Sequence, residues 1–288
     1  MFRNLSVFVD LIKYRLSLAV VLSSVTGYYL CRYTTDQHLF FLVVGVFLLS
    51  SGSAVLNQYT ERIPDSIMER TKTRPIPSKK ISKNSALWIS IILLASGSSF
   101  LNYNGTAPFL LGILTVLLYN LLYTYLKKIT ILSIIPGALV GVLPPIIGYY
   151  SAGGTVFHQN IFAFSIFMFL WQIPHFWLII IKHGKEYKAA GFATVSTYLN
   201  ETQIKFLVFF WVLSSNGFLF TYCILNDDLN NPLILVISLL NFLFIFLFYR
   251  LLFGKKESSG INCAFILINS FGVFLMFLLI AAAILKSL

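Results

Sequence analysis

The chain has 288 residues, of which 58% are hydrophobic and only 11% are charged. A soluble domain usually carries about a quarter charged residues, so this composition excludes a soluble globular fold and predicts an integral membrane protein. The formal net charge of +11 could suggest a nucleic-acid partner. Because basic residues in a membrane protein report its topology, we expect no nucleic acid and take the lipid bilayer as the partner.

Nine apolar segments are candidates for membrane-spanning helices, since a helix needs about 20 apolar residues to cross the bilayer core. Residues 1–15 precede them as a short amphipathic segment without an evident cleavable signal. The predicted fold class is therefore an all-α polytopic membrane bundle, with one membrane domain over residues 1–288. The expected spans are residues 16–31, 39–56, 86–101, 108–125, 131–150, 161–181, 206–225, 233–252 and 263–285.

Basic residues lie almost entirely on one side of this nine-span arrangement. Of the 21 Lys and Arg residues, all but Arg32 and Lys286 fall on the side of the N-terminus. The positive-inside rule then predicts a multi-pass protein of the cell (inner) membrane with a cytoplasmic N-terminus and an external C-terminus. The two longest polar connections, residues 59–85 and 182–205, both become cytoplasmic, so this face is the expected working face.

The most informative motif follows the second span. Asn57, Glu61 and Asp65 are spaced by four residues, so on a helix they share one face. Oxygen ligands on one face suit a hard cation such as Mg²⁺. The alternative is a polar loop that caps a helix and pairs with nearby arginines. Pro64 is expected to kink or end the helix just before Asp65.

Three basic residues, Arg70, Lys72 and Arg74, come directly after this motif. Guanidinium and ammonium groups bind phosphate oxygens well. Carboxylates, a divalent cation and arginines at a membrane surface together predict a binding site for a lipid diphosphate.

A second polar region begins in the sixth span with Trp171-Gln172-Ile173-Pro174-His175-Phe176-Trp177 and continues to Glu186. Pro174 interrupts the backbone hydrogen bonds within the span, which is tolerated beside protein or a cavity. His175 is either a buried, hydrogen-bonded histidine, an iron ligand, or a group that meets a propionate or a proton. Glu186 either supplies a second metal site that faces the first or pairs with Lys182.

The fourth span carries aromatic and basic side chains near its end. Tyr119 and Tyr123 share a helical face, and their rings could stabilise a carbocation. The alternative is an interfacial aromatic belt with snorkelling lysines, Lys127 and Lys128. In the fifth span, the double proline Pro144-Pro145 predicts a broken helix that borders a cavity.

Together these motifs resemble the UbiA-like intramembrane prenyltransferases. The first signature reads Asn57…Glu61…Asp65…Met68…Arg70-Thr71…Arg74-Pro75. Within these enzymes, the Trp171–Trp177 segment, Glu186-Tyr187 and Pro144-Pro145-x-x-Gly148 are similar to the protoheme IX farnesyltransferases, or heme O synthases. Lys13-x-Arg15 also fits the first helix of that family. The resemblance extends from about Leu11 to the last helix. It departs from the family at Glu61 and Glu186, where Asp is common, at Ile63-Pro64, and around Ser133 and Pro136.

The resemblance implies a helical bundle around a central cavity that opens near the cytoplasmic face. It implies Mg²⁺-dependent farnesyl transfer from farnesyl diphosphate to a vinyl group of heme B, with water addition, giving heme O for terminal oxidase biogenesis. The resemblance also implies that the protein contacts heme A synthase or the assembly machinery of a terminal oxidase. The implied roles are metal binding by Asn57, Glu61, Asp65 and Glu186; diphosphate neutralisation by Arg70, Lys72, Arg74 and Lys127 or Lys128; cation shielding by Tyr119 and Tyr123; and heme contact by His175 and Trp177.

Two other functions remain open from the sequence. A prenyltransferase acting on a quinone precursor would need a second acidic cluster, and only Glu186 is present there. A membrane transporter would also contain broken helices and buried histidines. A transporter, however, has no need of carboxylates and arginines massed in one cytoplasmic loop.

Overall fold

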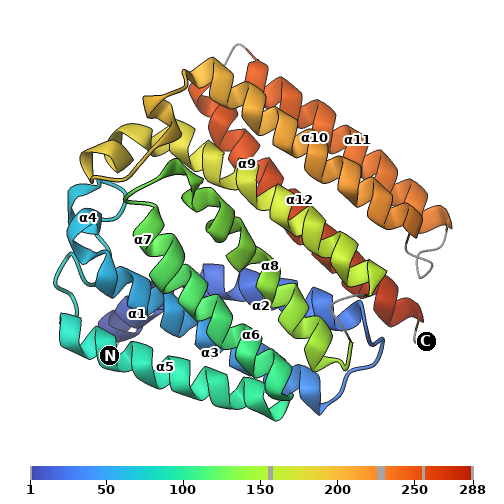
Figure 1. Ribbon diagram of the computed structural model, residues 1–288, viewed down its shortest axis with the longest axis horizontal. Helices are drawn as coiled ribbons and strands as arrows, with labels where there is room; N and C mark the ends of the chain where they lie inside the picture. The colour runs from blue at the N-terminus through green and yellow to red at the C-terminus, as the bar shows by residue number, and fades with distance from the viewer. Residues whose placement is uncertain (1, 155–157, 226–230, 255–256, 287–288) are drawn as a thin grey trace.

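The computed structural model describes residues 2–154, 158–225, 231–254 and 257–286, and within these ranges every regular element is helical (Figure 1). Three of the elements are short single turns that connect or continue longer helices. The helices are α1 Phe2–Leu11, α2 Tyr14–Tyr29, α3 Gln37–Thr60, α4 Arg62–Ile67, α5 Lys83–Tyr103, α6 Thr106–Leu117, the π-helix η1 Leu118–Tyr123, α7 Thr124–Leu126, the 3₁₀ turn η2 Ile131–Ser133, α8 Ile134–Ser151, α9 Gln159–Ala189, the 3₁₀ turn η3 Val195–Thr197, α10 Glu201–Leu225, α11 Asn231–Phe253 and α12 Glu257–Lys286.

Eight helices among the described residues are long and apolar enough to cross a membrane. They coincide with eight of the nine predicted spans, and α6, η1 and α7 join into one of them, Thr106–Leu126. The first predicted span, residues 16–31, differs. It corresponds to α2, which has 16 residues and at about 1.5 Å per residue is shorter than a full crossing of the bilayer core.

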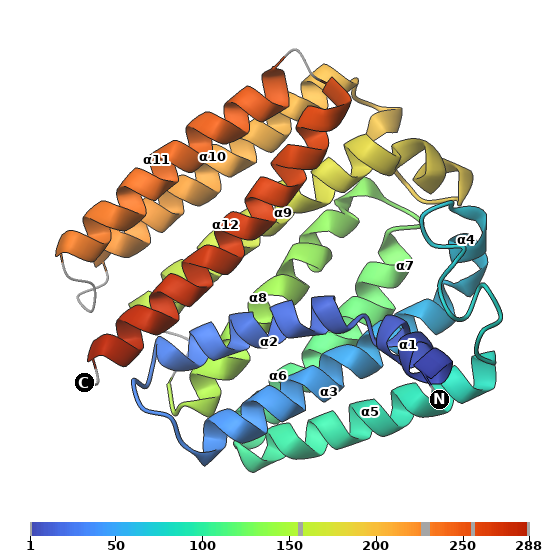
Figure 2. The ribbon, with the colours of Figure 1, turned by 180° about the vertical axis from the view of Figure 1, so that it is seen from behind.

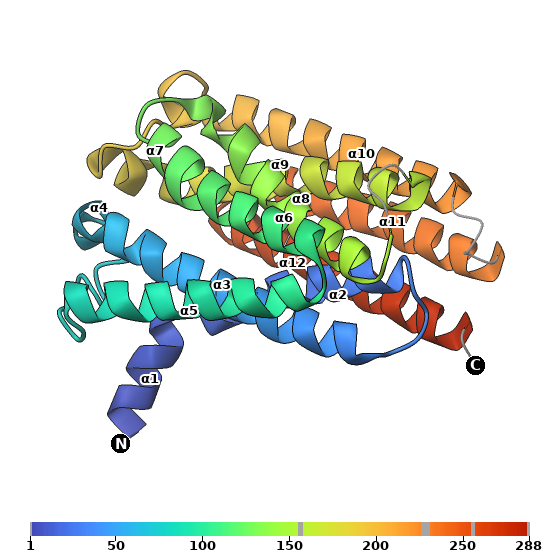
Figure 3. The same ribbon diagram turned by 60° about the horizontal axis from the view of Figure 1, so that its bottom comes forward.

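The helices α9 and α12 contact α10 and α11 on one side and α8 and α2 on the other. Figure 1 shows α10 and α11 at one edge, beside α9 and α12, and Figure 2 shows α2 running through the middle of the bundle between α12 and α3. Helix α1 leaves the bundle at an angle to α2 and α3 (Figure 3), as expected for an amphipathic segment that precedes the first span.

The expected break at the double proline did not occur. α8 runs without interruption from Ile134 to Ser151 across Pro144 and Pro145, and α9 runs from Gln159 to Ala189 across Pro174. The prediction of a broken helix at Pro144-Pro145 was therefore wrong. Neighbouring helices can hold a membrane helix together across prolines, because they satisfy or enclose the freed backbone groups.

The helices α2 and α8 approach each other closely. A Cβ atom at Gly148 would lie 1.8 Å from the Ser24 carbonyl oxygen, and one at Gly27 would lie 1.9 Å from the Pro145 carbonyl oxygen. Only glycine permits this approach of two backbones, as small residues do at helix interfaces in membranes. The contact fixes α2, and with it the residues at its N-terminal end, against the rest of the bundle.

Three of the polar connections meet at one end of the bundle. The Arg70 backbone N–H donates to a Glu186 carboxylate oxygen at 3.2 Å, and the Ala193 N–H donates to the Lys127 carbonyl at 3.0 Å. The connections that follow α4, α7 and α9 are therefore in contact. This agrees with the expectation that both long polar connections face the same side of the membrane.

The α2–α8 contact gives a stability prediction. Gly148→Ala should destabilise the protein by about 1–3 kcal/mol, because the new methyl group forces the two backbones apart. Gly217→Ala is the matched control, since nothing lies within 4 Å of a Cβ at that position in α10. It should be neutral or stabilising by up to about 1 kcal/mol. Thermal unfolding of both purified variants in one detergent measures the difference, and equal shifts would contradict the packing described.

Candidate active site

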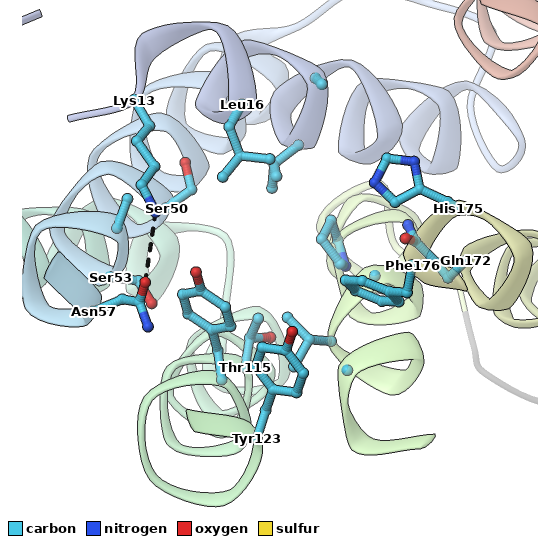
Figure 4. A pocket seen from close by; sticks show the side chains of 18 of the residues that line it. Lys13, Leu16, Ser50, Ser53, Asn57, Thr115, Tyr123, Gln172, His175 and Phe176 are labelled. Carbon is cyan, nitrogen blue, oxygen red and sulfur yellow. Dashed lines mark hydrogen bonds between the residues drawn. The ribbon is translucent and has the colours of Figure 1, made fainter. Parts of the chain in front are cut away.

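A cavity of about 380 Å³ lies inside the bundle, enclosed by α2, α3, α6, η1, α8, α9 and α12. Figure 4 shows Lys13 and Asn57 on one wall, facing Gln172, His175 and Phe176 on the opposite wall, with Thr115 and Tyr123 between them. Charged and polar side chains line the end near the polar connections, whereas apolar residues such as Val46, Leu49 and Ile147 line the remainder. The cavity therefore suits a ligand with an ionic group and a hydrocarbon part.

The predicted motif Asn57, Glu61 and Asp65 lines the charged end of this cavity. The Glu61 N–H donates to the Asn57 carbonyl at 2.9 Å, and the Asp65 N–H donates to the Glu61 carbonyl at 2.8 Å. This helical bonding carries the shared face across the junction of α3 and α4, as the spacing predicted. The break falls at Glu61, before Pro64. Pro64 sits in the first turn of α4, where a missing N–H costs little.

Each of these three side chains contacts a basic group. Arg74 Nη1 donates to both carboxylate oxygens of Asp65, at 2.9 and 2.7 Å. Lys127 forms an ion pair with Glu61, and Lys13 Nζ donates to Asn57 Oδ1 at 3.5 Å (Figure 4). Two buried carboxylates thus face three cations, and Arg70 also lines the cavity. The net charge at this end is positive, which favours an anionic ligand.

Lys13 was not among the predicted site residues, although Lys13-x-Arg15 had been noted as fitting the family. It lies at the corner between α1 and α2 with φ 48° and ψ 52°, a left-handed conformation that costs a non-glycine residue about 1–2 kcal/mol. Burial, reinforced by the charge of Arg74, lowers the pKa of Lys13 to about 7, while Glu61 and Asp65 act in the opposite direction. Strain and burial of this kind typically mark functional positions.

Tyr119 and Tyr123 both line the cavity, as their spacing predicted. Their rings stack with centroids 5.9 Å apart and an interplanar angle of 13°. Lys127 Nζ lies 5.3 Å from the centroid of the Tyr123 ring. A π-helical turn, Leu118–Tyr123, carries both tyrosines, and no sequence signal had indicated it. Turns of this type occur frequently at functional sites.

His175 also lines the cavity, and its ring packs between Trp171 and Phe265 at centroid distances of 5.9 and 5.0 Å. Its Nδ1 atom is buried and makes no hydrogen bond to another described residue, although the Asn269 side chain lies near the ring. One buried nitrogen of the ring is thus left without a partner among the described residues, and the alternative roles of His175 stay predictions. A buried polar atom without a partner is costly, and a ligand could supply one.

Four predicted site residues lie outside the lining of the cavity. Lys72 is half exposed and pairs with Glu69 at 2.6 Å, and Lys128 is exposed. Trp177 packs against the apolar core of the C-terminal helices. Each of the three belongs to a segment that reaches the cavity through other residues.

Glu186 is the fourth. It accepts the Arg70 backbone N–H at 3.2 Å and lies 3.2 Å from His183 Nδ1, so the proposed pair with Lys182 is replaced by these contacts. Among the described residues, no group of three or more His, Cys, Asp or Glu side chains is placed to share one metal ion. The four-residue metal set that included Glu186 is thus not assembled in this structure, and Glu186 instead holds the Arg70 segment in place.

Comparison with known proteins identifies the family. The model of the UbiA prenyltransferase family matches residues 20–279. The chain belongs to this family. It is accordingly a prenyltransferase, and the predicted all-α membrane bundle is confirmed.

Curated relatives and solved structures agree with this assignment. The chain is 36% identical over 184 residues to a protoheme IX farnesyltransferase of Geobacter sulfurreducens, covering 63% of this chain and 68% of the relative. It is 34% identical over 224 residues to that of Aquifex aeolicus, covering 76% and 75%. A UbiA homolog from Archaeoglobus fulgidus, bound to GPP and Mg²⁺, has the same fold, with a TM-score of 0.77, 15% identity and coverage of 96% and 98%.

The buried Asp65–Arg74 pair gives a prediction for folding. Arg74→Met should destabilise the protein by about 3–5 kcal/mol, because it leaves a buried carboxylate without its partner. The double variant Asp65→Asn/Arg74→Met should recover most of the loss. Lys72→Met is the control, since an exposed pair contributes at most about 1 kcal/mol. Unfolding of the three variants in detergent tests this, and equal effects of Arg74→Met and Lys72→Met would contradict it.

Proposed function

We propose that this UbiA-family prenyltransferase is a protoheme IX farnesyltransferase, which transfers the farnesyl group of farnesyl diphosphate to a vinyl group of heme B and, with water addition, yields heme O. The names of its relatives support this. The observation that carries the proposal is one cavity with a cationic end and, opposite, an aromatic wall that contains His175, whose buried Nδ1 atom has no hydrogen-bond partner among the described residues. The first suits a diphosphate and the second a porphyrin.

Mg²⁺ fits the chemistry of the charged end. Asn57, Glu61 and Asp65 present amide and carboxylate oxygens on one wall, and Mg²⁺ is usually bound by one or two carboxylates together with substrate phosphates. The Archaeoglobus homolog was solved with GPP and Mg²⁺. When bound, the ion would neutralise charge on the diphosphate leaving group.

We propose that the basic residues exchange partners when substrate enters. Without substrate, Arg74 and Lys127 neutralise Asp65 and Glu61. With a metal and a diphosphate bound, the carboxylates would face cationic charge and the basic residues would face anionic charge, so each group would keep an oppositely charged partner. Arg70, Arg74, Lys127 and Lys13 then donate to phosphate oxygens and stabilise the charge that develops on the leaving group.

The reaction follows from this arrangement. The allylic C–O bond breaks, and its electron pair leaves with the diphosphate. Tyr119 and Tyr123 place their π faces beside the cationic farnesyl carbon. The vinyl π electrons form the new C–C bond, and the resulting cation next to the porphyrin takes a water oxygen and releases a proton. The farnesyl chain fits the aliphatic part of the cavity, which is lined by Val20, Val46, Leu49, Val116 and Ile147.

The membrane orientation belongs to the same proposal. The distribution of Lys and Arg supports a cytoplasmic N-terminus and an inner-membrane location, so that the charged end of the cavity meets water-soluble diphosphate. The last two residues, which would lie outside the cell, are not among the described residues. Contact with heme A synthase or terminal oxidase assembly stays a prediction of the resemblance. A quinone-precursor substrate is less well supported, since Glu186 is the only carboxylate between Glu69 and Glu201 and a second acidic cluster is therefore not encoded there.

The function is tested by the hemes of cells that express the chain. Mass spectrometry of extracted hemes should show a hydroxyethylfarnesyl heme that is absent from cells carrying an empty vector. Asp65→Ala should abolish this product while the variant remains in the membrane, because a major electrostatic stabiliser of the leaving group is lost. Prenylation of a quinone precursor with unchanged heme would support the alternative substrate instead.

A substitution of His175 distinguishes an enzyme that acts on heme from a prenyltransferase that acts on another substrate. His175→Ala should weaken heme binding and lower heme O formation, with little effect on farnesyl diphosphate binding, because the ring lies on the wall opposite the charged end. His38→Ala is the control, since His38 bonds to Asn104 far from the site along α3. Heme titration by absorbance, beside diphosphate binding, measures both variants. If His175→Ala binds heme with the affinity of the parent protein, His175 serves only in packing.

A further inference from the structure

Asn57 can act as a ligand only if its carbonyl oxygen, rather than its amino group, faces the cavity. Oδ1 accepts from Lys13 Nζ at 3.5 Å, and Nδ2 donates to Thr124 Oγ1 at 3.1 Å. The contact with Lys13 Nζ suits this orientation of the amide, in which the carbonyl oxygen faces the amine. Lys13, however, is one of the groups proposed to leave for the diphosphate, so it cannot hold the amide in the loaded enzyme.

Thr124 supplies the second determinant of this orientation. Its hydroxyl donates to the Tyr119 carbonyl at 2.8 Å, and a carbonyl only accepts. The single hydroxyl proton is therefore already committed, and the oxygen can only accept from Asn57. The amino group of Asn57 must then face Thr124, and Oδ1 must face the cavity. Asn57 and Thr124 are 3% and 4% exposed, so water does not compete easily for these bonds.

The π-helical turn places the hydroxyl where it can do this. The Thr124 backbone N–H donates to the Tyr119 carbonyl five residues earlier, which closes the π turn. Both the N–H and the hydroxyl of Thr124 thus meet the same carbonyl. One turn earlier, Asn120 Nδ2 donates to Ser53 Oγ, so two side-chain bonds fix this segment against α3 at residues four apart. The turn is held rigidly beside the ligand wall.

We infer that Thr124 is a positioning residue that keeps the Asn57 carbonyl oxygen directed at the metal–diphosphate complex. The inference rests on the proposed role of Asn57. Partners that orient a metal ligand typically contribute about 10–100-fold to metal affinity, although they do not touch the metal. The side chain acts through one donated and one accepted hydrogen bond, so a hydroxyl is required and the methyl group is not.

The test compares Thr124→Val, which keeps the shape, with Thr124→Ser, which keeps the hydroxyl. The probe is Mn²⁺, followed by electron paramagnetic resonance, binding to the full-length protein saturated with farnesyl S-thiolodiphosphate. Thr124→Val should weaken Mn²⁺ binding by about 10–100-fold, and Thr124→Ser should bind like the parent. Thr221→Val is the control, because Thr221 is exposed on α10 and bonds only to its own helix. If Thr124→Val does not fold, Thr124→Ala replaces it in the same comparison.

Asn57→Ala separates the two levels of the proposal. If Asn57→Ala weakens Mn²⁺ binding and Thr124→Val does not, the inference about Thr124 is overturned and the metal role of Asn57 stands. If Thr124→Ser is as weak as Thr124→Val, the hydroxyl is not the determinant and the inference is again overturned. If Asn57→Ala itself binds Mn²⁺ like the parent, the proposed metal site fails. Loss in Thr124→Val with recovery in Thr124→Ser supports the inference.

Discussion

The structure depends on the neutralisation of two carboxylates inside a membrane bundle. Glu61 and Asp65 are 4% and 1% exposed, and an unpaired buried carboxylate would cost several kcal/mol. Lys127 and Arg74 remove that cost. Because the two bases come from different connections, their pairing with the acids also ties those connections together. The same groups that allow the fold to enclose charge are the groups proposed to take up the metal–diphosphate complex.

The backbone around the site is irregular at two points, each of which directs a polar side chain toward it. Lys13 lies in a left-handed conformation at the corner before α2. The π turn at Leu118–Tyr123 places Thr124 beside Asn57. Each distortion costs free energy locally and directs one polar side chain toward the cavity, and regular helices surround them.

The sequence predicted the parts of the site that follow from local periodicity. The four-residue spacing of Asn57, Glu61 and Asp65 keeps them on one face across the junction of α3 and α4. Tyr119 and Tyr123, also four residues apart, both line the cavity. Sequence could not predict Lys13 or Thr124, because their roles arise from contacts between segments 44 and 67 residues apart. The double proline wrongly predicted a break in α8, since packing against neighbouring helices held that helix intact. Lys72 and Glu186 had the expected chemistry, but tertiary contacts directed them elsewhere.

The central claim is that the ion pairs open only for a metal and a diphosphate together. Calorimetric titration of the purified protein with Mn²⁺, without and with farnesyl S-thiolodiphosphate, tests it most directly. The account predicts weak or undetectable binding of the metal alone, because Arg74 and Lys127 already occupy the carboxylates and the site carries excess positive charge. It predicts strong binding once the diphosphate analogue is present. Equal metal affinity with and without the analogue would contradict the account.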